Sequence, residues 1–439
     1  MQLQTFQSII AEFQARKALE FTRRTGEITL VPDTASVIAG PRRCGKTYRT
    51  YQCIADLFSQ GVTPDQICRI QFNDLQLRGL TTADLLLIDR AFYSLHPGLR
   101  GTKTVYFVFD EIQRIEGWED YVLHLLDMPS HRVLITGSTS HLLSGNFATQ
   151  LRGKCLNHTL HGFSFREYCA YHAIAGDAIE PGGQSRLQHA FQGYLLHGSM
   201  PGVYAVPQHQ HVELLQTYWH TMLVRDILEV HAQDGISFDA FSWFAQSLAS
   251  RIGCPATIRK LHENLSSAGL ELSSEAGYRY LRYLKECFAV YAVPIHTQSE
   301  KIRTRNPVKI YACDWALASA VSFAGSVDVT RMFENMVFLH LLRQGRTIHY
   351  LTTRQGHEVD FVSVTPHAKI ELFQACYELN STSRDRELRA IVGAAAHLGA
   401  AAATIVTWAQ EEAVMLDGVR VEVTPAWRWM WDGQPIASI

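Results

Sequence analysis

A glycine-rich segment near the N-terminus has the residue types and spacing of a phosphate-binding loop. It reads Gly40-Pro-Arg-Arg-Cys-Gly-Lys-Thr47 and matches the pattern G-x-x-x-x-G-K-[ST]. Gly40 and Gly45 allow the backbone to curl, so that its N–H groups and the positive end of the following helix face an anion. Lys46 is expected to bridge the β- and γ-phosphates of a nucleotide, and the Thr47 hydroxyl to ligate Mg²⁺. The predicted loop comprises Gly40, Pro41, Arg42, Arg43, Cys44, Gly45, Lys46 and Thr47.

Two adjacent carboxylates follow an apolar segment further along the chain. Val105–Phe109 has the composition of a buried strand and leads directly into Asp110 and Glu111. Such a strand delivers these carboxylates to the carboxyl edge of a parallel sheet, where ligands of α/β sheets bind. Asp110 is expected to hold Mg²⁺ together with Thr47, and Glu111 to polarise the attacking water as a general base. The two segments together predict ATP binding and hydrolysis, with ATP and Mg²⁺ as the ligands.

A third segment, Leu134-Ile-Thr-Gly137, reads as a strand that ends in small polar residues. Ser138 or Thr139 would then sense the γ-phosphate or orient the attacking water. The alternative interpretation is a strand capped by a serine/threonine turn before a helix. Both interpretations remain open from the residues alone.

The elements that must position these residues alternate between strand and helix, which is typical of a parallel α/β sheet. In the first third, strands are expected at Ala35–Ala39, Ile67–Phe72, Thr104–Phe109 and Arg132–Thr136, with a helix at Tyr48–Gln60. Helices and loops follow Gly162, and Asp177–Gln184 is expected to be a linker or lid loop. The α/β pattern returns near the C-terminus, with helices at Phe333–Leu342 and Arg384–His397 and strands at Thr347–Leu351, Val359–Val364, Leu372–Tyr377 and Thr404–Trp408. A tight hairpin at Asp417-Gly418 joins Ala413–Leu416 to Val419–Val423.

The composition is that of a globular chain without a strong global charge. The sequence has 439 residues, of which 47% are hydrophobic and 19% charged, and its formal net charge is −2. Nine scattered cysteines without a C-x-x-C pair favour a reducing cytosol. The most apolar window, Ile391–Val406, is too short to span a membrane and is expected to be a buried helix that runs into a strand. A cytoplasmic protein with no membrane contact is therefore expected.

Taken together, these segments resemble the AAA-superfamily ATP-binding proteins of bacteria and archaea whose C-terminal half is a domain of unknown function. The resemblance covers nearly the whole chain and also rests on Gly162-Phe-Ser-Phe-Arg-Glu-Tyr168, Gly198-Ser-Met-Pro-Gly202, Lys309-Ile-Tyr-Ala-Cys-Asp314, Phe333-Glu-Asn335, Glu358-Val-Asp-Phe361 and Pro425-Ala-Trp427. It implies an AAA-type ATPase domain over residues 1–160, a helical lid or linker over 161–235, a winged-helix region over 236–325 and a restriction-endonuclease-like domain over 326–439.

The chain departs from the family where an arginine is a candidate for stabilising transition-state charge. Family members show Gly-Arg where this chain has Gly153-Lys154. Lysine supplies the charge without the fork geometry of a guanidinium, and the neighbouring Arg152 is a candidate substitute. Because no convincing arginine finger lies within the chain's own motifs, a neighbouring subunit is expected to supply one, and a homo-oligomer is expected.

The C-terminal domain departs from the pattern of a working nuclease. The resemblance implies acidic residues followed by D/E-x-K, and Glu334, Glu358 and Asp360 are present. Gln374 and Cys376 stand where the metal-binding acid and the lysine belong. The domain is therefore expected to be catalytically degenerate and to serve packing or nucleic-acid binding.

The middle region is expected to be a winged helix, with helices at Ala256–Ser267 and Ser273–Lys285 and a strand at Ala289–Pro294. The second helix carries a basic-aromatic set that would face DNA, namely Tyr278, Arg279, Tyr280, Arg282, Tyr283 and Lys285, and Lys301, Arg303 and Arg305 would form the wing. The alternative is a solvated helix that packs on neighbouring domains.

The leading hypothesis for the whole chain is an ATP-dependent switch or remodelling ATPase associated with DNA. Two alternatives remain open. One is a non-motor nucleic-acid-binding or defence-type module that uses ATP to assemble, and the other is an ATP-gated nuclease.

Overall fold

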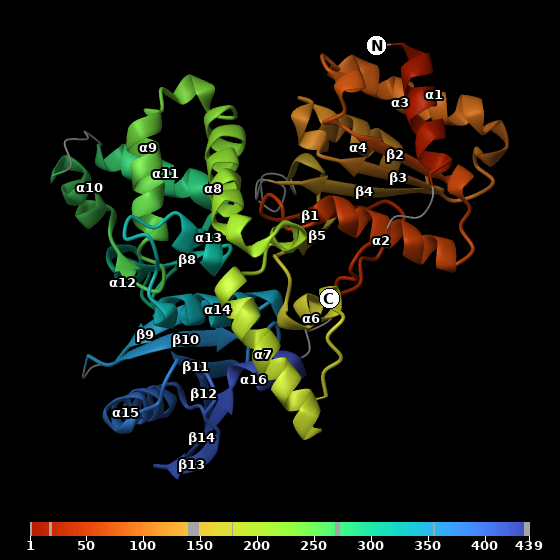
Figure 1. Ribbon diagram of the computed structural model, residues 1–439. Coiled ribbons are helices and arrows are strands. Elements are labelled where there is room, and N and C mark those ends of the chain that lie inside the picture. The colour runs from red at the N-terminus through yellow and green to blue at the C-terminus, as the bar shows by residue number, and fades with distance from the viewer. Residues whose placement is uncertain are drawn as a thin grey trace. The chain divides into compact units, whose positions relative to one another are not determined.

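The chain divides into two compact units in a computed structural model, which describes residues 2–16, 20–138, 149–177, 179–267, 273–353 and 356–433 (Figure 1). Unit 1 extends from Met1 to Leu160 and unit 2 begins at His161. Within the described ranges, no helix has both the length and the apolar character needed to cross a membrane.

Unit 1 is built on a five-stranded parallel sheet with the strand order β2-β3-β4-β1-β5. Its strands are β1 (Ala35–Ala39), β2 (Ile67–Gln71), β3 (Val105–Asp110), β4 (His131–Gly137) and β5 (Cys155–Thr159). Its helices are α1 (Leu3–Gln14), α2 (Lys46–Ser59), α3 (Thr82–Leu95) and α4 (Trp118–Leu126). The predicted α/β class with a parallel sheet core is confirmed.

Successive residues of β3 face opposite sides of this sheet, as the pleat of a strand requires. Val108 belongs to the apolar cluster that includes Ile54 of α2. Phe107 instead lies 5.8 Å from the ring of Phe92 in α3. Asp110 is two residues beyond Val108 and therefore lies on the α2 side. This alternation brings the carboxylate to the helix that begins with the glycine-rich loop.

Unit 2 begins with helices α6 (Phe165–Tyr171), α7 (Pro181–His197) and α8 (His211–Thr221), the last of which continues into a π-helix at Met222–Leu228. The prediction of a loop at Asp177–Gln184 was wrong in its second half, because α7 begins at Pro181. Proline is well tolerated at the first position of a helix, where its missing N–H is not needed. The buried side chains of Leu187, Phe191 and Tyr194 anchor the helix despite its two early glycines.

The middle of unit 2 combines helices with a small antiparallel sheet. Along the chain come α9 (Phe238–Ala249), β6 (Pro255–Ala256), α10 (Ile258–Ser267), α11 (Ser274–Glu286), β7 (Val290–Val293), α12 (Glu300–Arg305), β8 (Val308–Ala312) and α13 (Trp315–Ala320). The strands pair in the order β6-β8-β7. Helix α11 buries Gly277, Tyr280, Tyr283 and Leu284. The prediction that Tyr280 and Tyr283 face DNA was therefore wrong, because both side chains pack into the apolar core of unit 2.

The C-terminal part of unit 2 is a mixed six-stranded sheet in the order β13-β14-β12-β11-β10-β9. Its elements are α14 (Val329–Arg343), β9 (Thr347–Thr352), β10 (Glu358–Val364), β11 (Ile370–Cys376), α15 (Ser381–Leu398), β12 (Ala402–Thr407), β13 (Glu412–Leu416), β14 (Val419–Pro425) and α16 (Ala426–Asp432). Asp417 and Gly418 have φ values of 48° and 79°, which two-residue hairpins with a type I′ turn require.

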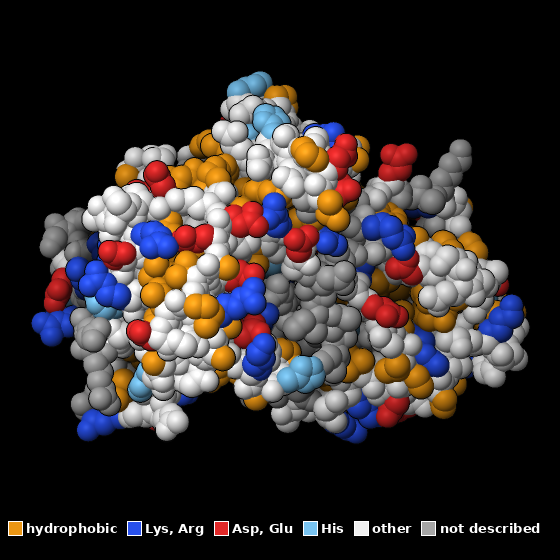
Figure 2. Space-filling view, turned by 90° about the horizontal axis from the view of Figure 1, so that it is seen from below, with side chains coloured by type: hydrophobic (Ala, Val, Ile, Leu, Met, Phe, Trp, Pro, Cys, Tyr) orange, Lys and Arg blue, Asp and Glu red, His pale blue; other side chains and the backbone are white. Residues whose placement is uncertain are grey.

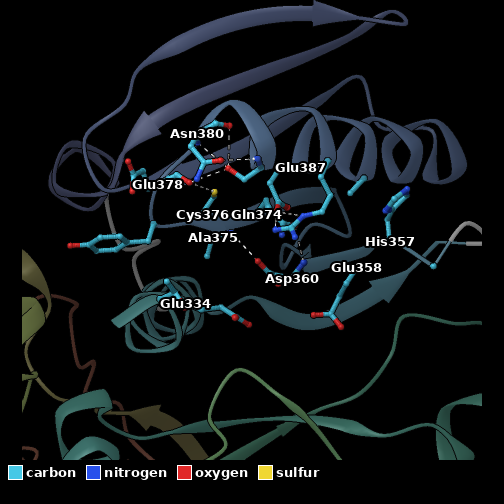
Figure 3. Close-up of a pocket in the computed structure, with 16 residues that line it drawn as sticks. Glu334, His357, Glu358, Asp360, Gln374, Ala375, Cys376, Glu378, Asn380 and Glu387 are labelled. Atoms are coloured by element: carbon cyan, nitrogen blue, oxygen red, sulfur yellow. Dashed lines mark hydrogen bonds and ion pairs between the residues drawn. The ribbon is translucent and has the colours of Figure 1, made fainter. Parts of the chain in front are cut away.

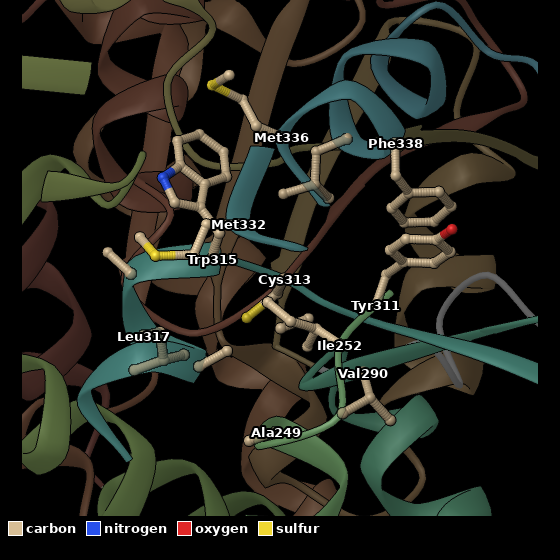
Figure 4. Close-up of a cluster of buried hydrophobic side chains, with 14 of the residues drawn as sticks. Ala249, Ile252, Val290, Tyr311, Cys313, Trp315, Leu317, Met332, Met336 and Phe338 are labelled. Atoms are coloured by element: carbon tan, nitrogen blue, oxygen red, sulfur yellow. The ribbon is translucent and has the colours of Figure 1, made fainter. Parts of the chain in front are cut away.

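One apolar core joins the middle and C-terminal parts of unit 2 (Figure 4). The ring of Tyr311 in β8 stacks on that of Phe338 in α14, with centroids 4.3 Å apart. Trp315 is fully buried, and its Nε1 donates to the carbonyl oxygen of Leu195 at 2.7 Å. Strand β8 is therefore held rigidly against α14, and this fixes where a polar side chain on β8 can reach.

Candidate functional site

The glycine-rich loop joins β1 to α2 in unit 1. Gly45 adopts a left-handed conformation with φ 102° and caps the N-terminus of α2. Gly40 follows β1, and a Cβ atom at this position would collide with the backbone oxygen of Leu160. Only glycine meets the close approach at Gly40, and glycine meets the left-handed geometry of Gly45 without strain. The two glycines that the motif specifies are thus explained by the path of the backbone.

Lys46 lies buried over its own loop. Its Nζ donates to the carbonyl oxygens of Gly40 and Pro41, both at 3.0 Å, and only 6% of the residue is exposed. Both bonds are to neutral acceptors, which hold an ammonium less strongly than phosphate oxygens would. Lys46 is therefore placed to exchange these carbonyls for an anion in the loop.

Asp110 connects the ends of β3 and β4 to the first turn of α2. The hydroxyl of Thr47 donates to Asp110 Oδ2 at 2.8 Å, and that of Thr136 donates to Oδ1. Asp110 is only 1% exposed. Thr47 and Asp110 thus present adjacent hard oxygen ligands beside the loop, which is the donor chemistry that Mg²⁺ prefers. The structure brings together the residues that the sequence predicted as metal ligands.

Arg69 also reaches this carboxylate, and the sequence analysis missed it. Its Nη2 lies 3.4 Å from Asp110 Oδ2, and its guanidinium lies 4.5 Å from the ring centroid of Tyr51 in α2. Burial lowers the pKa of Arg69, although the nearby Tyr51 and Asp110 oppose this effect. An arginine inside an otherwise apolar strand was the available signal, since a charge there needs a partner.

Glu111 begins the turn after β3 with a left-handed φ of 61°. Its backbone N–H donates to the carbonyl oxygen of Thr136 at 3.2 Å. Ser138, at the end of β4, donates from Oγ to Glu111 Oε2 at 3.5 Å. Glu111 and Ser138 are therefore neighbours at the carboxyl edge of the sheet, whereas Thr139 lies outside the described residues.

Arg152 and Lys154 lie away from the loop of their own chain. They immediately precede β5, whose first residue pairs with Ala35 at the start of β1, whereas the loop follows the end of β1. Five strand residues separate the two ends, or about 17 Å at 3.3 Å per residue. Lys154 Nζ pairs with Asp33 Oδ1 at 2.6 Å. Within one chain, neither side chain is brought to the phosphate loop.

Three protein-family models match consecutive parts of the chain. A model of an AAA domain matches residues 32–169, and models of two domains of unknown function match residues 188–328 and 329–429. Residues 32–169 of the chain are thus similar to an AAA domain. The resemblance stated from the sequence, an AAA-type core followed by a C-terminal region of unknown function, is confirmed.

Two proteins are similar to this chain along most of its length. The uncharacterized protein MJ1544 of Methanocaldococcus jannaschii is 28% identical over 435 residues, which are 96% of this chain and 93% of that protein. An uncharacterized protein of Haemophilus influenzae is 26% identical over 334 residues, 75% of this chain and 80% of its own. Among solved structures, the chain is similar to the Walker-type ATPase paby2304 of Pyrococcus abyssi, with a TM-score of 0.43, 12% identity and coverage of 65% and 90% of the two chains.

A second polar cluster lies in unit 2, where β8, α14 and β10 meet. Lys309 in β8 is fully buried, and its Nζ lies 2.8 Å from Glu334 Oε1, 2.7 Å from Glu358 Oε1 and 2.9 Å from Asp360 Oδ1. Tyr311 donates to Glu334 Oε1 at 2.6 Å. The ammonium therefore donates hydrogen bonds to Glu334 and Asp360 and forms an ion pair with Glu358. We call these four charged residues the Lys309 cluster.

The charges of this cluster are strongly coupled. Burial and the charge of Asp360 raise the pKa of Glu334 to about 7. Burial alone would lower the pKa of Lys309, but the charges of Asp360, Tyr311, Glu334 and Glu358 raise it well above its ordinary value. Lys309 thus stays charged, and its ammonium offsets the charges of Glu334 and Asp360, which are largely shielded from water.

A cavity of about 610 Å³ borders the Lys309 cluster (Figure 3). Gln374 in β11 accepts the backbone N–H of Asp360 at 3.1 Å, and Cys376 donates to the carbonyl oxygen of Glu378 at 3.3 Å. Among the described residues no group of three or more His, Cys, Asp or Glu side chains is arranged to hold a metal ion. Here the centre of the carboxylates is filled by Lys309, which the sequence analysis did not assign to this cluster.

Proposed function

We propose that the AAA domain binds ATP with Mg²⁺ and hydrolyses it to drive a conformational switch. The observation that carries this proposal is the convergence of Lys46, the Thr47–Asp110 pair and Glu111 at one edge of the sheet. In this proposal Thr47 and Asp110 would hold Mg²⁺, which would supply positive charge against the phosphates. Lys46 leaves the loop carbonyls and turns to the same phosphates.

Glu111 is assigned the general-base role in this reaction. The water oxygen forms a bond to the γ-phosphorus, the bond between that phosphorus and the bridging oxygen breaks, and the water proton passes to Glu111. Ser138 is proposed to orient the water or to sense the γ-phosphate beside Glu111, since its hydroxyl is directed at the same carboxylate. The nucleotide state would then be transmitted through the ends of β3 and β4.

The location of Arg152 and Lys154 supports an oligomeric enzyme. The two cations precede β5 at the end of the sheet opposite to the loop, so we propose that they act on the nucleotide of a neighbouring copy. Arg152 is exposed and carries the fork geometry that best matches phosphate oxygens. A homo-oligomer in the cytoplasm is the corresponding assembly.

The decisive experiment is steady-state ATP hydrolysis by the purified chain at increasing protein concentration, with DNA, RNA or no additive. We expect Mg²⁺-dependent phosphate release, and activity per molecule that rises with concentration as subunits assemble. ATP binding without measurable turnover under every condition would contradict the enzyme and favour an assembly module. A turnover number independent of concentration would contradict the subunit-supplied cation.

We propose that the middle region is a winged helix and that it binds DNA. The order of elements from α9 to β8 fits that motif, and Tyr278 of α11 is 65% exposed. Arg282 is exposed as well but already pairs with Glu286 at 3.6 Å. Lys301, Arg303 and Arg305 lie on α12 between β7 and β8, and the Arg305 side chain lies outside the described part. On the face displayed in Figure 2, acidic and basic side chains are interspersed, so any DNA contact would rest on local residues.

The C-terminal domain is expected not to cut nucleic acid. Gln374 offers only an amide oxygen, which binds a hard cation more weakly than a carboxylate does. The charge of Lys309 is already engaged by Glu334, Glu358 and Asp360. Incubation with supercoiled plasmid in Mg²⁺ or Mn²⁺ should leave the plasmid intact. Nicking by the wild type that disappears in Asp360→Ala would overturn this prediction and favour an ATP-gated nuclease.

A further inference from the structure

The turn that follows β3 orients the carboxylate of Glu111 through its own backbone. Glu111 is a non-glycine residue in the left-handed region, where its Cβ atom crowds the backbone. A 3-10 helix, Ile112–Arg114, starts directly after it. This sharp change of direction brings the side chain of Gln113 back toward the carboxylate two residues earlier. The strained backbone therefore places a side-chain amide beside the proposed base.

Gln113 contacts one specific oxygen of that base. Its Nε2 donates to Glu111 Oε2 at 2.6 Å, and Ser138 Oγ lies 3.5 Å from the same oxygen. Among the described residues, none donates a hydrogen bond to the other oxygen, Oε1. Two donors thus hold one oxygen, and the plane of the carboxylate is fixed with Oε1 as the acceptor that remains for a water molecule.

The orientation of the Gln113 amide satisfies only one of its two ends. The amide nitrogen has a hydrogen-bond acceptor, whereas the amide oxygen has no donor among the described residues. Gln113 Oε1 is buried and has no hydrogen-bond partner in the described part of the chain. A buried oxygen without a partner destabilises the folded state. The opposite orientation would turn this oxygen toward the Glu111 carboxylate, where two acceptors repel. The charge-assisted bond to Glu111 therefore determines how the amide is oriented.

We propose that Gln113 is a positioning residue that aligns Glu111 for proton transfer from the attacking water. The inference rests on the proposed function, in which Glu111 is the general base. Gln113 acts on the base and not on the nucleotide, because its side chain donates to Glu111 and the phosphate ligands lie on other elements. Its loss should therefore affect the chemical step while substrate binding is retained.

The test replaces Gln113 with methionine, which keeps the length of the side chain but removes the N–H donor. We expect kcat to fall about 10- to 100-fold, with an unchanged dissociation constant for ATP. This loss is smaller than the roughly 10²- to 10⁴-fold that general-base catalysis contributes, because the base itself remains. Gln113→Glu should lower kcat further, since it places a second carboxylate against Glu111. The matched control is Glu116→Ala, an exposed side chain in the same turn, which should retain wild-type kcat and KM.

A double-mutant comparison separates positioning from a general structural role. In a Glu111→Gln background, Gln113→Met should cause no further loss of kcat, because the residue acts through the missing base. Wild-type kcat in Gln113→Met, or a loss that appears in the ATP dissociation constant and not in kcat, overturns the inference. If Glu111→Gln itself hydrolyses ATP like the wild type, the proposed base fails and the inference with it. If Glu111→Gln is inactive and Gln113→Met is fully active, only the inference fails.

Discussion

Replacement of Glu111 by glutamine should lower kcat for ATP hydrolysis at least about 100-fold while ATP remains bound, since general-base catalysis contributes about 10²- to 10⁴-fold. Glutamine has nearly the same shape but cannot accept the water proton at neutral pH. The substitution leaves the proposed metal ligands in place, with Thr47 Oγ1 at 2.8 Å from Asp110 Oδ2. Single-turnover hydrolysis and equilibrium ATP binding, measured on the same preparation, test both halves of this expectation.

Lys46→Ala should impair binding and not the chemical step, because it removes the charge that is proposed to hold the phosphates. We expect ATP binding itself to be lost, while Lys103→Ala, which changes an exposed lysine of the same unit, should bind ATP normally. The contrast between a variant that binds without turnover and one that does not bind distinguishes the base from the phosphate ligand. Wild-type hydrolysis in Glu111→Gln would show that another group accepts the proton.

The positions of these residues follow from local patterns, and the sequence therefore predicted them. A run of apolar residues that ends in Asp110 predicts a buried strand, and alternation along that strand decides which face the carboxylate occupies. The glycines of the loop are specified by backbone geometry that does not depend on the rest of the fold. Such features are encoded within a few consecutive residues.

Contacts between segments that are distant in the sequence could not be predicted from such local patterns. Arg69 meets Asp110 across neighbouring strands, and Lys309 meets residues 25 to 51 positions later in the chain. Each lies within an apolar strand, which signals that a charge must be satisfied, but the partner depends on strand order and register. Gln113 is close to Glu111 in sequence, yet its contact depends on the left-handed conformation of Glu111. Glutamate does not favour this conformation, so the residue types do not predict it.

Lys309→Met should destabilise the protein strongly, by about 3–5 kcal/mol, which is typical when one partner of a buried ion pair is removed. Methionine fills a similar volume, so the expected loss comes from the carboxylates of Glu334 and Asp360, which are left buried without a counter-charge. The matched control is Lys369→Met. Lys369 also pairs with a glutamate, at 2.9 Å, but it is 73% exposed, and such surface pairs contribute about 0–1 kcal/mol. Urea unfolding followed by tryptophan fluorescence measures both variants.

The pH dependence of the Lys309→Met effect identifies its electrostatic cause. In the wild type, the pKa of Glu334 is raised from 4.5 to about 7 by burial and by the charge of Asp360. The folded state therefore binds more protons than the unfolded state between these values, so the contribution of Glu334 to stability is full below pH 4.5 and is lost as the pH rises through about 7. Without the ammonium, ionisation of the buried carboxylates becomes more costly still. We expect the destabilisation by Lys309→Met to be smaller at pH 5, where protonation relieves the uncompensated charge, and larger at pH 8. An equal loss at both pH values would show instead that Lys309 acts through the packing of its side chain against β8 and α14.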